Sequence, residues 1–61
     1  MNTRTRFEAA IPTFKPERLQ AEIAWYTNMI AYWKSQGRAE CELESLRETL
    51  RLLREQQERQ S

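Results

Sequence analysis

The sequence has no histidine and no aspartate, and its 61 residues include a single cysteine, Cys41. One cysteine cannot form an internal disulfide, so a disulfide framework is excluded as a source of stability. Without histidine, one chain cannot assemble the usual zinc or haem sites, or a Ser–His–Asp or Cys–His catalytic arrangement. We therefore expect no metal, no cofactor and no enzymatic activity.

Glycine and long apolar runs are also scarce. Gly37 is the only glycine, which excludes a glycine-rich loop for binding phosphate. The longest apolar run, Met29 to Trp33, is far shorter than the ~20 residues of a membrane-spanning helix. No apolar region follows Arg4 and Arg6, so we expect no secretory signal. Because a lone cysteine fits a reducing compartment, we predict a cytoplasmic protein without a membrane partner.

The charges of the chain are close to balanced. Lys and Arg together number 10, Glu numbers 9, the net charge is +1 and the mean hydropathy is −0.90. With 39% hydrophobic residues, the chain is too apolar and too balanced in charge for a disordered protein. Its length allows one small domain. The near-neutral charge removes the strongest argument for nonspecific binding to nucleic acid.

The N-terminal segment, residues 1–15, is predicted to be an extended arm. Proline disfavours the helical conformation of the residue before it. Pro12 and Pro16 therefore push Ile11 and Lys15 toward extended backbone. We expect the chain between Ile11 and Pro16 to be extended or turning.

A first helix is predicted for residues 16–36. Pro16 suits the first helical position, where no backbone N–H is needed, and Gly37 suits the left-handed position that follows a helix. Apolar residues recur with the 4, 3, 4, 3 spacing of one helix face, and a second stripe lies beside them. The first stripe is Leu19, Ile23, Tyr26, Ile30 and Trp33, and the second is Trp25, Met29 and Tyr32.

A second helix is predicted for residues 38–57, followed by a frayed polar tail at 58–61. Glutamates crowd its start and arginines crowd its end, which is the arrangement that the helix dipole favours. Its apolar residues again follow the 4, 3, 4, 3 spacing. They are Ala39, Leu43, Leu46, Leu50 and Leu53.

The short connection around Gly37 decides how the two predicted helices are arranged. A link of two or three residues forces consecutive helices to run antiparallel. The sequence therefore predicts an all-α fold. We expect a single domain over residues 1–61, made of an antiparallel two-helix hairpin with an extended N-terminal arm.

Such a hairpin has more apolar surface than its two helices can cover. One line of contact buries one stripe of the first helix, so the second stripe forms a patch typical of an interface. Chains this short often gain stability by oligomerisation. We predict a homodimer in which two hairpins form a four-helix bundle. The predicted interface residues are Leu19, Ile23, Trp25, Tyr26, Met29, Ile30, Tyr32, Trp33, Leu43, Leu46, Leu50 and Leu53.

Two alternatives to this homodimer stay open. Phe7, Ile11 and Phe14 of the arm can fold back over the second stripe and close a monomer. They can also cross to a partner subunit and strengthen the dimer. In the second alternative, the chain folds only on a different protein.

A row of arginines on the second helix supports a different function. Arg47, Arg51 and Arg54 lie on one side of that helix, and with Arg4 and Arg6 of the arm they can contact phosphates. A dimeric nucleic-acid-binding hairpin is therefore the alternative hypothesis. Glutamates on the same side of the helix argue against it, and a solvated face with salt bridges is the simpler interpretation.

Two resemblances bear on function. From Pro16 through Gly37 to Gln57, the chain resembles in topology the short antiparallel hairpin proteins of mobile elements, such as the plasmid RNA-binding protein Rop. The stretch IPTFKPERLQAEI at 11–23, followed by Trp25, Trp33 and a single glycine turn, is similar in general character to small early-region accessory proteins of lambda-like temperate phages. The second resemblance implies a host-directed or regulatory interaction protein without enzymatic activity, and it assigns no functional residue.

The features together favour a small non-enzymatic interaction or regulatory accessory protein. We expect it to act as a helical-hairpin dimer that presents a helical surface, or its arm, to a protein partner.

Overall fold

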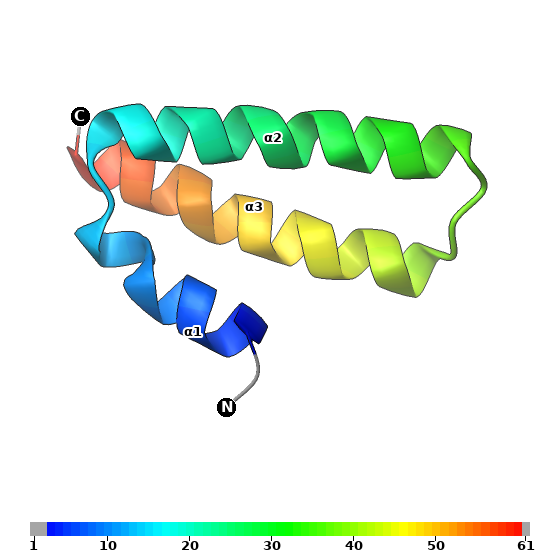
Figure 1. The fold of residues 1–61 in the computed structure, drawn as a ribbon, viewed down its shortest axis with the longest axis horizontal. Helices are drawn as coiled ribbons and strands as arrows, with labels where there is room; N and C mark the ends of the chain where they lie inside the picture. The colour runs from blue at the N-terminus through cyan, green and yellow to red at the C-terminus, as the bar shows by residue number, and fades with distance from the viewer. Residues whose placement is uncertain (1–2, 61) are drawn as a thin grey trace.

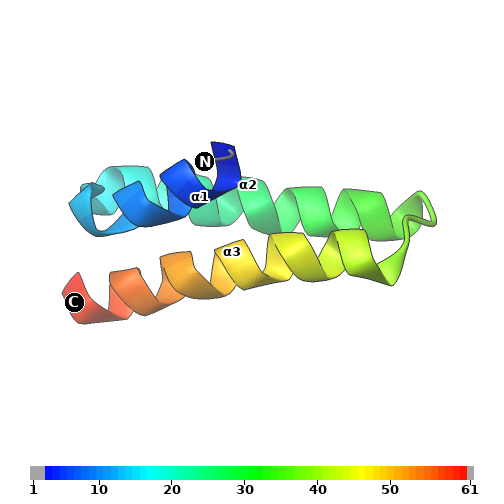
Figure 2. The same ribbon diagram turned by 90° about the horizontal axis from the view of Figure 1, so that it is seen from below.

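The computed structural model describes residues 3–60, and every regular element among these residues is helical. The elements are α1 (Thr3–Ala10), a short 3-10 turn η1 (Ile11–Thr13), α2 (Pro16–Ser35) and α3 (Glu40–Gln60). The predicted all-α class is thereby confirmed. The two long helices, α2 and α3, lie side by side and run in opposite directions (Figure 1). Figure 2 shows α1 packed near the end of this pair that lies far from the α2–α3 connection.

Helix α2 has the boundaries that its sequence predicts to within one residue. It starts at Pro16, after Lys15 in extended backbone with ψ 158°. At its other end Gly37 has φ 75°, and its N–H donates to the carbonyl of Lys34 at 3.2 Å. The N–H of Arg38 donates to the carbonyl of Trp33 at 3.1 Å. These two bonds form a Schellman motif, which satisfies carbonyls that the end of a helix leaves free.

Helix α3 begins and ends later than the predicted range 38–57. Arg38 belongs to the turn. The first backbone hydrogen bonds of α3 run from the N–H groups of Glu42 and Leu43 to the carbonyl of Ala39. The predicted frayed tail at 58–61 is wrong for residues 58–60, which are helical, and Ser61 lies outside the described residues. One cause is a tertiary bond, because Nε2 of Gln60 donates to the carbonyl oxygen of Phe14 at 3.0 Å.

The predicted extended arm is wrong for most of its length. Residues 3–10 form α1 and residues 11–13 form η1, while extended backbone is confined to Phe14 and Lys15. Proline restricts only the residue before it, and in η1 Pro12 takes one of the first two helical positions, where no N–H is required. An ion pair of 2.7 Å between Arg4 and Glu8 supports α1.

The N-terminal segment packs on its own chain and closes a core at one end of α2 and α3. Ile11 and Phe14 are almost fully buried, beside the completely buried Leu19 and Leu53. Their burial explains why the segment folds back, since removing such side chains from water stabilises the fold by about 1.5–3 kcal/mol each. Five half-exposed side chains pack around this core. They are Phe7, Ala10, Ile23, Tyr26 and Leu52.

Aromatic contacts attach α1 to α2. The ring of Phe7 lies 5.5 Å from the ring of Phe14 and 5.9 Å from the ring of Tyr26. Burial by this cluster raises the pKa of the Tyr26 phenol above its usual value, and the negative charges of Glu22 and Glu8 raise it further. The protonated phenol is therefore the form that the folded chain prefers.

The raised pKa of Tyr26 predicts a loss of stability at high pH. The folded chain holds the phenol proton more tightly than the unfolded chain does. The resulting stabilisation is complete below the unfolded pKa of about 10, and it disappears as the pH rises through the higher folded value. Urea unfolding followed by circular dichroism between pH 8 and 11 should show a smaller decline for Tyr26→Phe than for the wild type. Tyr32→Phe, on the same helix, is the control, and an equal decline in all three proteins would contradict the prediction.

The left-handed conformation of Gly37 predicts a measurable cost of substitution. Nothing lies within 4 Å of a β-carbon built at this position, so Gly37→Ala adds backbone strain without a steric clash. We expect a loss of about 1–2 kcal/mol in the free energy of unfolding. Gln36→Ala is the matched control, because Gln36 has an ordinary φ of −86°. Equal stabilities of the two variants in urea denaturation would refute this role of Gly37.

Candidate protein-interaction surface

Two aromatic side chains of α2 remain largely in solvent. Trp25 is 52% exposed and Tyr32 is 60% exposed. They are seven residues apart, which is close to two full turns, and therefore lie on one face of α2. Large apolar side chains left uncovered together are typical of an interaction surface.

The packing of α1 and α3 explains why this face is uncovered. Helix α3 covers the opposite side of α2, where Leu19 is completely buried, and α1 reaches α2 through Tyr26. The Trp25 indole meets the Tyr26 ring edge-on at 4.9 Å. Trp25 thus touches the core cluster at its margin, while the rest of its surface faces water.

The residues around Trp25 and Tyr32 are small and uncharged. With 3.6 residues per turn, they fall in a sector of about 120° around the helix axis, centred on Asn28. Asn28 lies on the side of α2 opposite to the buried Leu19. All members of this sector are exposed. Glu17, in the first turn of α2, also falls in it, and we call the part of the sector from Ala21 to Ser35 the α2 outer face. Its members are Ala21, Ala24, Trp25, Asn28, Ala31, Tyr32 and Ser35.

The aromatic members of this face are among the interface residues predicted from the sequence, and its small members are not. Two signals in the sequence point to them. No charged residue occurs from Ile23 to Trp33, whereas α3 carries charges throughout. A second 4, 3, 4, 3 spacing also runs along α2, parallel to the stripe that packs on α3. It consists of Ala21, Trp25, Asn28, Tyr32 and Ser35.

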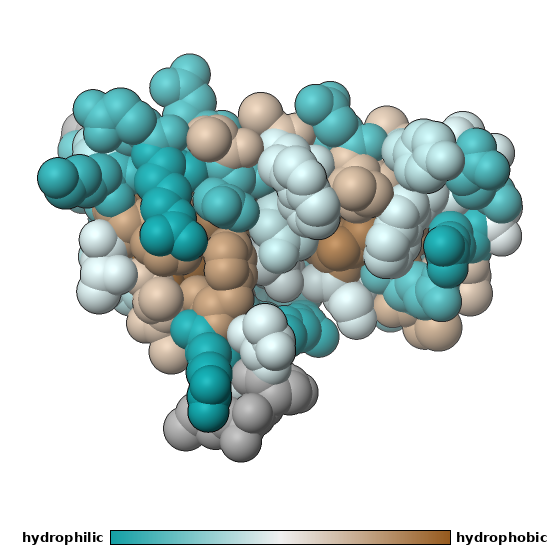
Figure 3. Space-filling model, viewed as in Figure 1, coloured by the Kyte–Doolittle hydropathy of each residue, from teal (hydrophilic) through white to brown (hydrophobic). Residues whose placement is uncertain are grey.

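The predicted interface residues divide into two groups in the structure. Most of them contribute to the packing inside one chain: Leu19, Leu43, Leu50 and Leu53 are buried, and Ile23, Tyr26, Met29, Ile30, Trp33 and Leu46 are partly buried. Of the predicted interface residues, only Trp25 and Tyr32 are exposed. Figure 3 shows apolar surface gathered where the N-terminal segment meets the long helices and, in a smaller patch, between α2 and α3, with hydrophilic residues around both.

The predicted phosphate-contacting arginines are largely engaged with glutamates. Arg47 pairs with Glu40 at 3.3 Å, and Arg51 pairs with both Glu55, at 2.7 Å, and Glu48. The hydrogen bond from Arg51 lowers the pKa of the Glu48 carboxyl and raises the pKa of Arg51 itself. Arg4 pairs with Glu8 at 2.7 Å.

These ion pairs weaken the case for a nucleic-acid interface. A phosphate group would have to compete with carboxylates that are already in place, and the nearby glutamates would repel it. Arg6 and Arg54 are exposed, but they lie on different helices. The structure therefore brings no uncompensated row of cations together from the predicted set.

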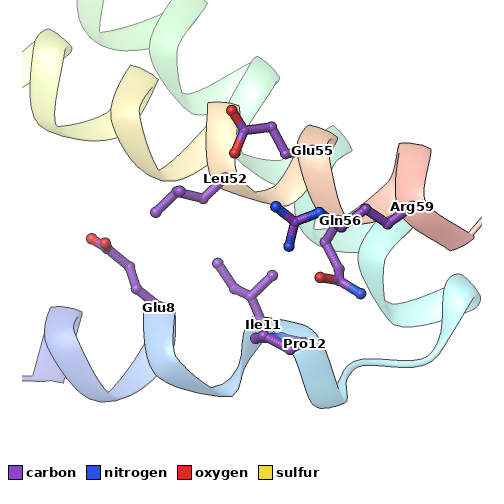
Figure 4. A pocket seen from close by; sticks show the side chains of 7 residues that line it. All are labelled: Glu8, Ile11, Pro12, Leu52, Glu55, Gln56 and Arg59. Atoms are coloured by element: carbon purple, nitrogen blue, oxygen red, sulfur yellow. The ribbon is translucent and has the colours of Figure 1, made fainter.

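A shallow groove of about 140 Å³ lies between the N-terminal segment and α3. Figure 4 shows the apolar side chains of Ile11 and Leu52 pointing toward one another across it. Two carboxylates line the groove, and each already bonds an arginine: Glu8 to Arg4 and Glu55 to Arg51.

Residues 3–60 contain neither a cluster of metal ligands nor a membrane-spanning helix. Within this part of the chain, no three residues of the types His, Cys, Asp or Glu are grouped so that they could hold a metal ion. None of its helices combines the length and the apolar character needed to cross a membrane.

Comparisons with known proteins add nothing to this geometry. No protein-family model, no curated protein and no solved structure matches the chain. The α2 outer face is therefore interpreted from its own residues.

Proposed function

We propose that this protein is a small non-enzymatic interaction protein, of the regulatory or accessory kind, that binds through the α2 outer face. The observation that carries the proposal is the exposure of Trp25 and Tyr32 on a stretch of helix without charges. Tryptophan and tyrosine are enriched among the residues that dominate binding energy, and charged residues are depleted from the centres of interfaces. The α2 outer face has both features, because it carries a tryptophan and a tyrosine and lacks charged residues.

The surroundings of the two rings suit the approach of another helix. Small side chains flank them, so a partner backbone can come close and leave the rings as projecting anchors. The α2 outer face has no charged side chain, so covering it carries no desolvation penalty for an ion. A helix packed on this face would bury the exposed portions of both rings.

We further propose that the protein acts as a dimer of helical hairpins, in which four long helices associate. A 61-residue chain buries a modest core, and oligomerisation is a common source of additional stability at this size. Each hairpin consists of α2 and α3, joined through Gly37. An accessory role of the kind found in temperate phages fits this proposal, because such a role needs a binding surface and no active site.

A cytoplasmic location belongs to the same proposal. Cys41 is a free thiol and it is exposed. Exposed thiols persist in reducing compartments, where disulfide formation is disfavoured.

Truncation of both rings tests the proposal. Trp25→Ala combined with Tyr32→Ala should raise the dimer dissociation constant at least about 10-fold, because truncating interface aromatics commonly costs 2 kcal/mol or more. Sedimentation equilibrium at several concentrations measures this constant, and circular dichroism should show that the helical content is kept.

A matched control exists on the same helix. Thr27 and Lys34 are also exposed and seven residues apart, but they lie about 100° or more from the centre of the α2 outer face. Thr27→Ala combined with Lys34→Ala should leave the dissociation constant unchanged. If the wild type sediments as a 7.4 kDa monomer at all concentrations, or if both double variants behave alike, the proposed dimer through this face is refuted.

A further inference from the structure

We propose that the α2 outer face is occupied by the same face of a second copy of this chain, with the two α2 helices antiparallel and Asn28 near the two-fold axis. This inference rests on the proposed function and adds to it the identity, direction and register of the partner helix. Three observations support it: the uncovered side of α2, the alternation of large and small side chains on that side, and the residue at its centre.

The first step is that one side of α2 packs inside the chain and the opposite side does not. The side that includes Leu19 and Tyr26 packs in the core of the chain. The side that runs from Ala21 to Ser35 is exposed along its whole length. Trp25 and Tyr32 lie two turns apart on this side and form a row along the helix axis, which is the shape that a second helix covers.

The second step is that large and small residues alternate so that the face fits a copy of itself. In helix pairing, a projecting side chain enters a hole formed by four residues of the facing helix, spaced i, i+3, i+4 and i+7. In the antiparallel register centred near Asn28, the hole for Trp25 consists of Asn28, Ala31, Tyr32 and Ser35 of the second copy. The hole for Tyr32 consists of Ala21, Ala24, Trp25 and Asn28 of the second copy.

Three of the four residues in each hole are small, so each ring has room to enter. The fourth residue is the other aromatic, so Trp25 of one copy lies beside Tyr32 of the second copy, where aromatic pairs gain additional stability. A parallel register gives a poorer fit. In it Trp25 meets Trp25 at one level, while Ala21 and Asn28 meet their own small counterparts at the neighbouring levels.

The third step concerns Asn28, the residue at the centre of the face. A carboxamide has both donor and acceptor atoms, so two Asn28 side chains that meet near a two-fold axis can bond each other reciprocally. The uncharged stretch from Ile23 to Trp33 adds no like-charge repulsion on either side of them. The antiparallel direction also places the positive end of each helix dipole beside the negative end of the other. All three observations therefore select the second copy as occupant.

Disulfide cross-linking in the full-length chain tests the direction and the register. In a Cys41→Ser background, Asn28→Cys should cross-link with itself under mild oxidation, and Thr27→Cys should not. Ala21→Cys and Ser35→Cys should each fail to cross-link alone and should form a mixed disulfide when combined, which mass spectrometry identifies. In the antiparallel register position 21 of one copy faces position 35 of the other, whereas each position is far from its own counterpart.

The outcomes separate this inference from the proposed function. Cross-linking of Ala21→Cys with itself shows a parallel pair, which overturns the register while the dimer stands. A wild-type dimer in which Asn28→Cys cross-links no better than Thr27→Cys places the contact elsewhere and overturns this inference. A wild type that is monomeric at all concentrations overturns this inference and the proposed dimer, and it leaves the α2 outer face as a binding surface for a different protein.

A charge placed at the centre gives a second, independent measurement. Asn28→Asp brings two carboxylates together near the axis and should raise the dimer dissociation constant at least about 10-fold, since like charges in close contact repel strongly. Thr27→Asp adds the same charge one residue away, outside the face, and should change the constant less than about 2-fold. Equal effects of the two substitutions would overturn the central position of Asn28.

Discussion

Helix α2 has more neutral and apolar surface than its neighbours in the chain can cover, and the rest of the structure depends on this imbalance. Helix α3 covers one side, where Leu19 and Leu53 are completely buried. The N-terminal segment covers part of a second side through Phe7 and Phe14. Within residues 3–60 no further element covers the side that carries Trp25 and Tyr32. This uncovered side of α2 is the surface for which a binding function is proposed.

The long helices could be predicted from the sequence because local rules determine them. Apolar spacing, Pro16 at the first helical position and the single glycine at 37 place α2 within one residue of its observed range. The N-terminal segment could not be predicted in this way. Its conformation depends on contacts of Ile11 and Phe14 with residues far along the chain, and the end of α3 depends on a bond from Gln60 to Phe14. Neither contact produces a pattern of neighbouring residues from which it could be predicted.

The candidate surface was only half visible in the sequence for a similar reason. Aromatic residues at helical spacing predicted Trp25 and Tyr32, but the same spacing also included Tyr26 and Trp33, which are partly buried. Which ring faces water depends on where α3 and α1 sit around α2. Only with that arrangement known do alanines and an asparagine become part of the surface, because small residues carry no signal of exposure on their own.

The bond between Gln60 and the Phe14 carbonyl has a consequence for how the molecule opens. It links the last turn of α3 to the segment that precedes α2, so η1, α2 and α3 pack together around Ile11, Phe14, Leu19 and Leu53 at this end of the helix pair. The opposite end has two helices joined by the Gly37 turn, where Arg38 lies 4.9 Å above the Trp33 ring. Local unfolding should therefore be graded along the long axis of the helix pair, with amide protons near the Gly37 turn exchanging with solvent sooner than those beside the Leu19 and Leu53 core.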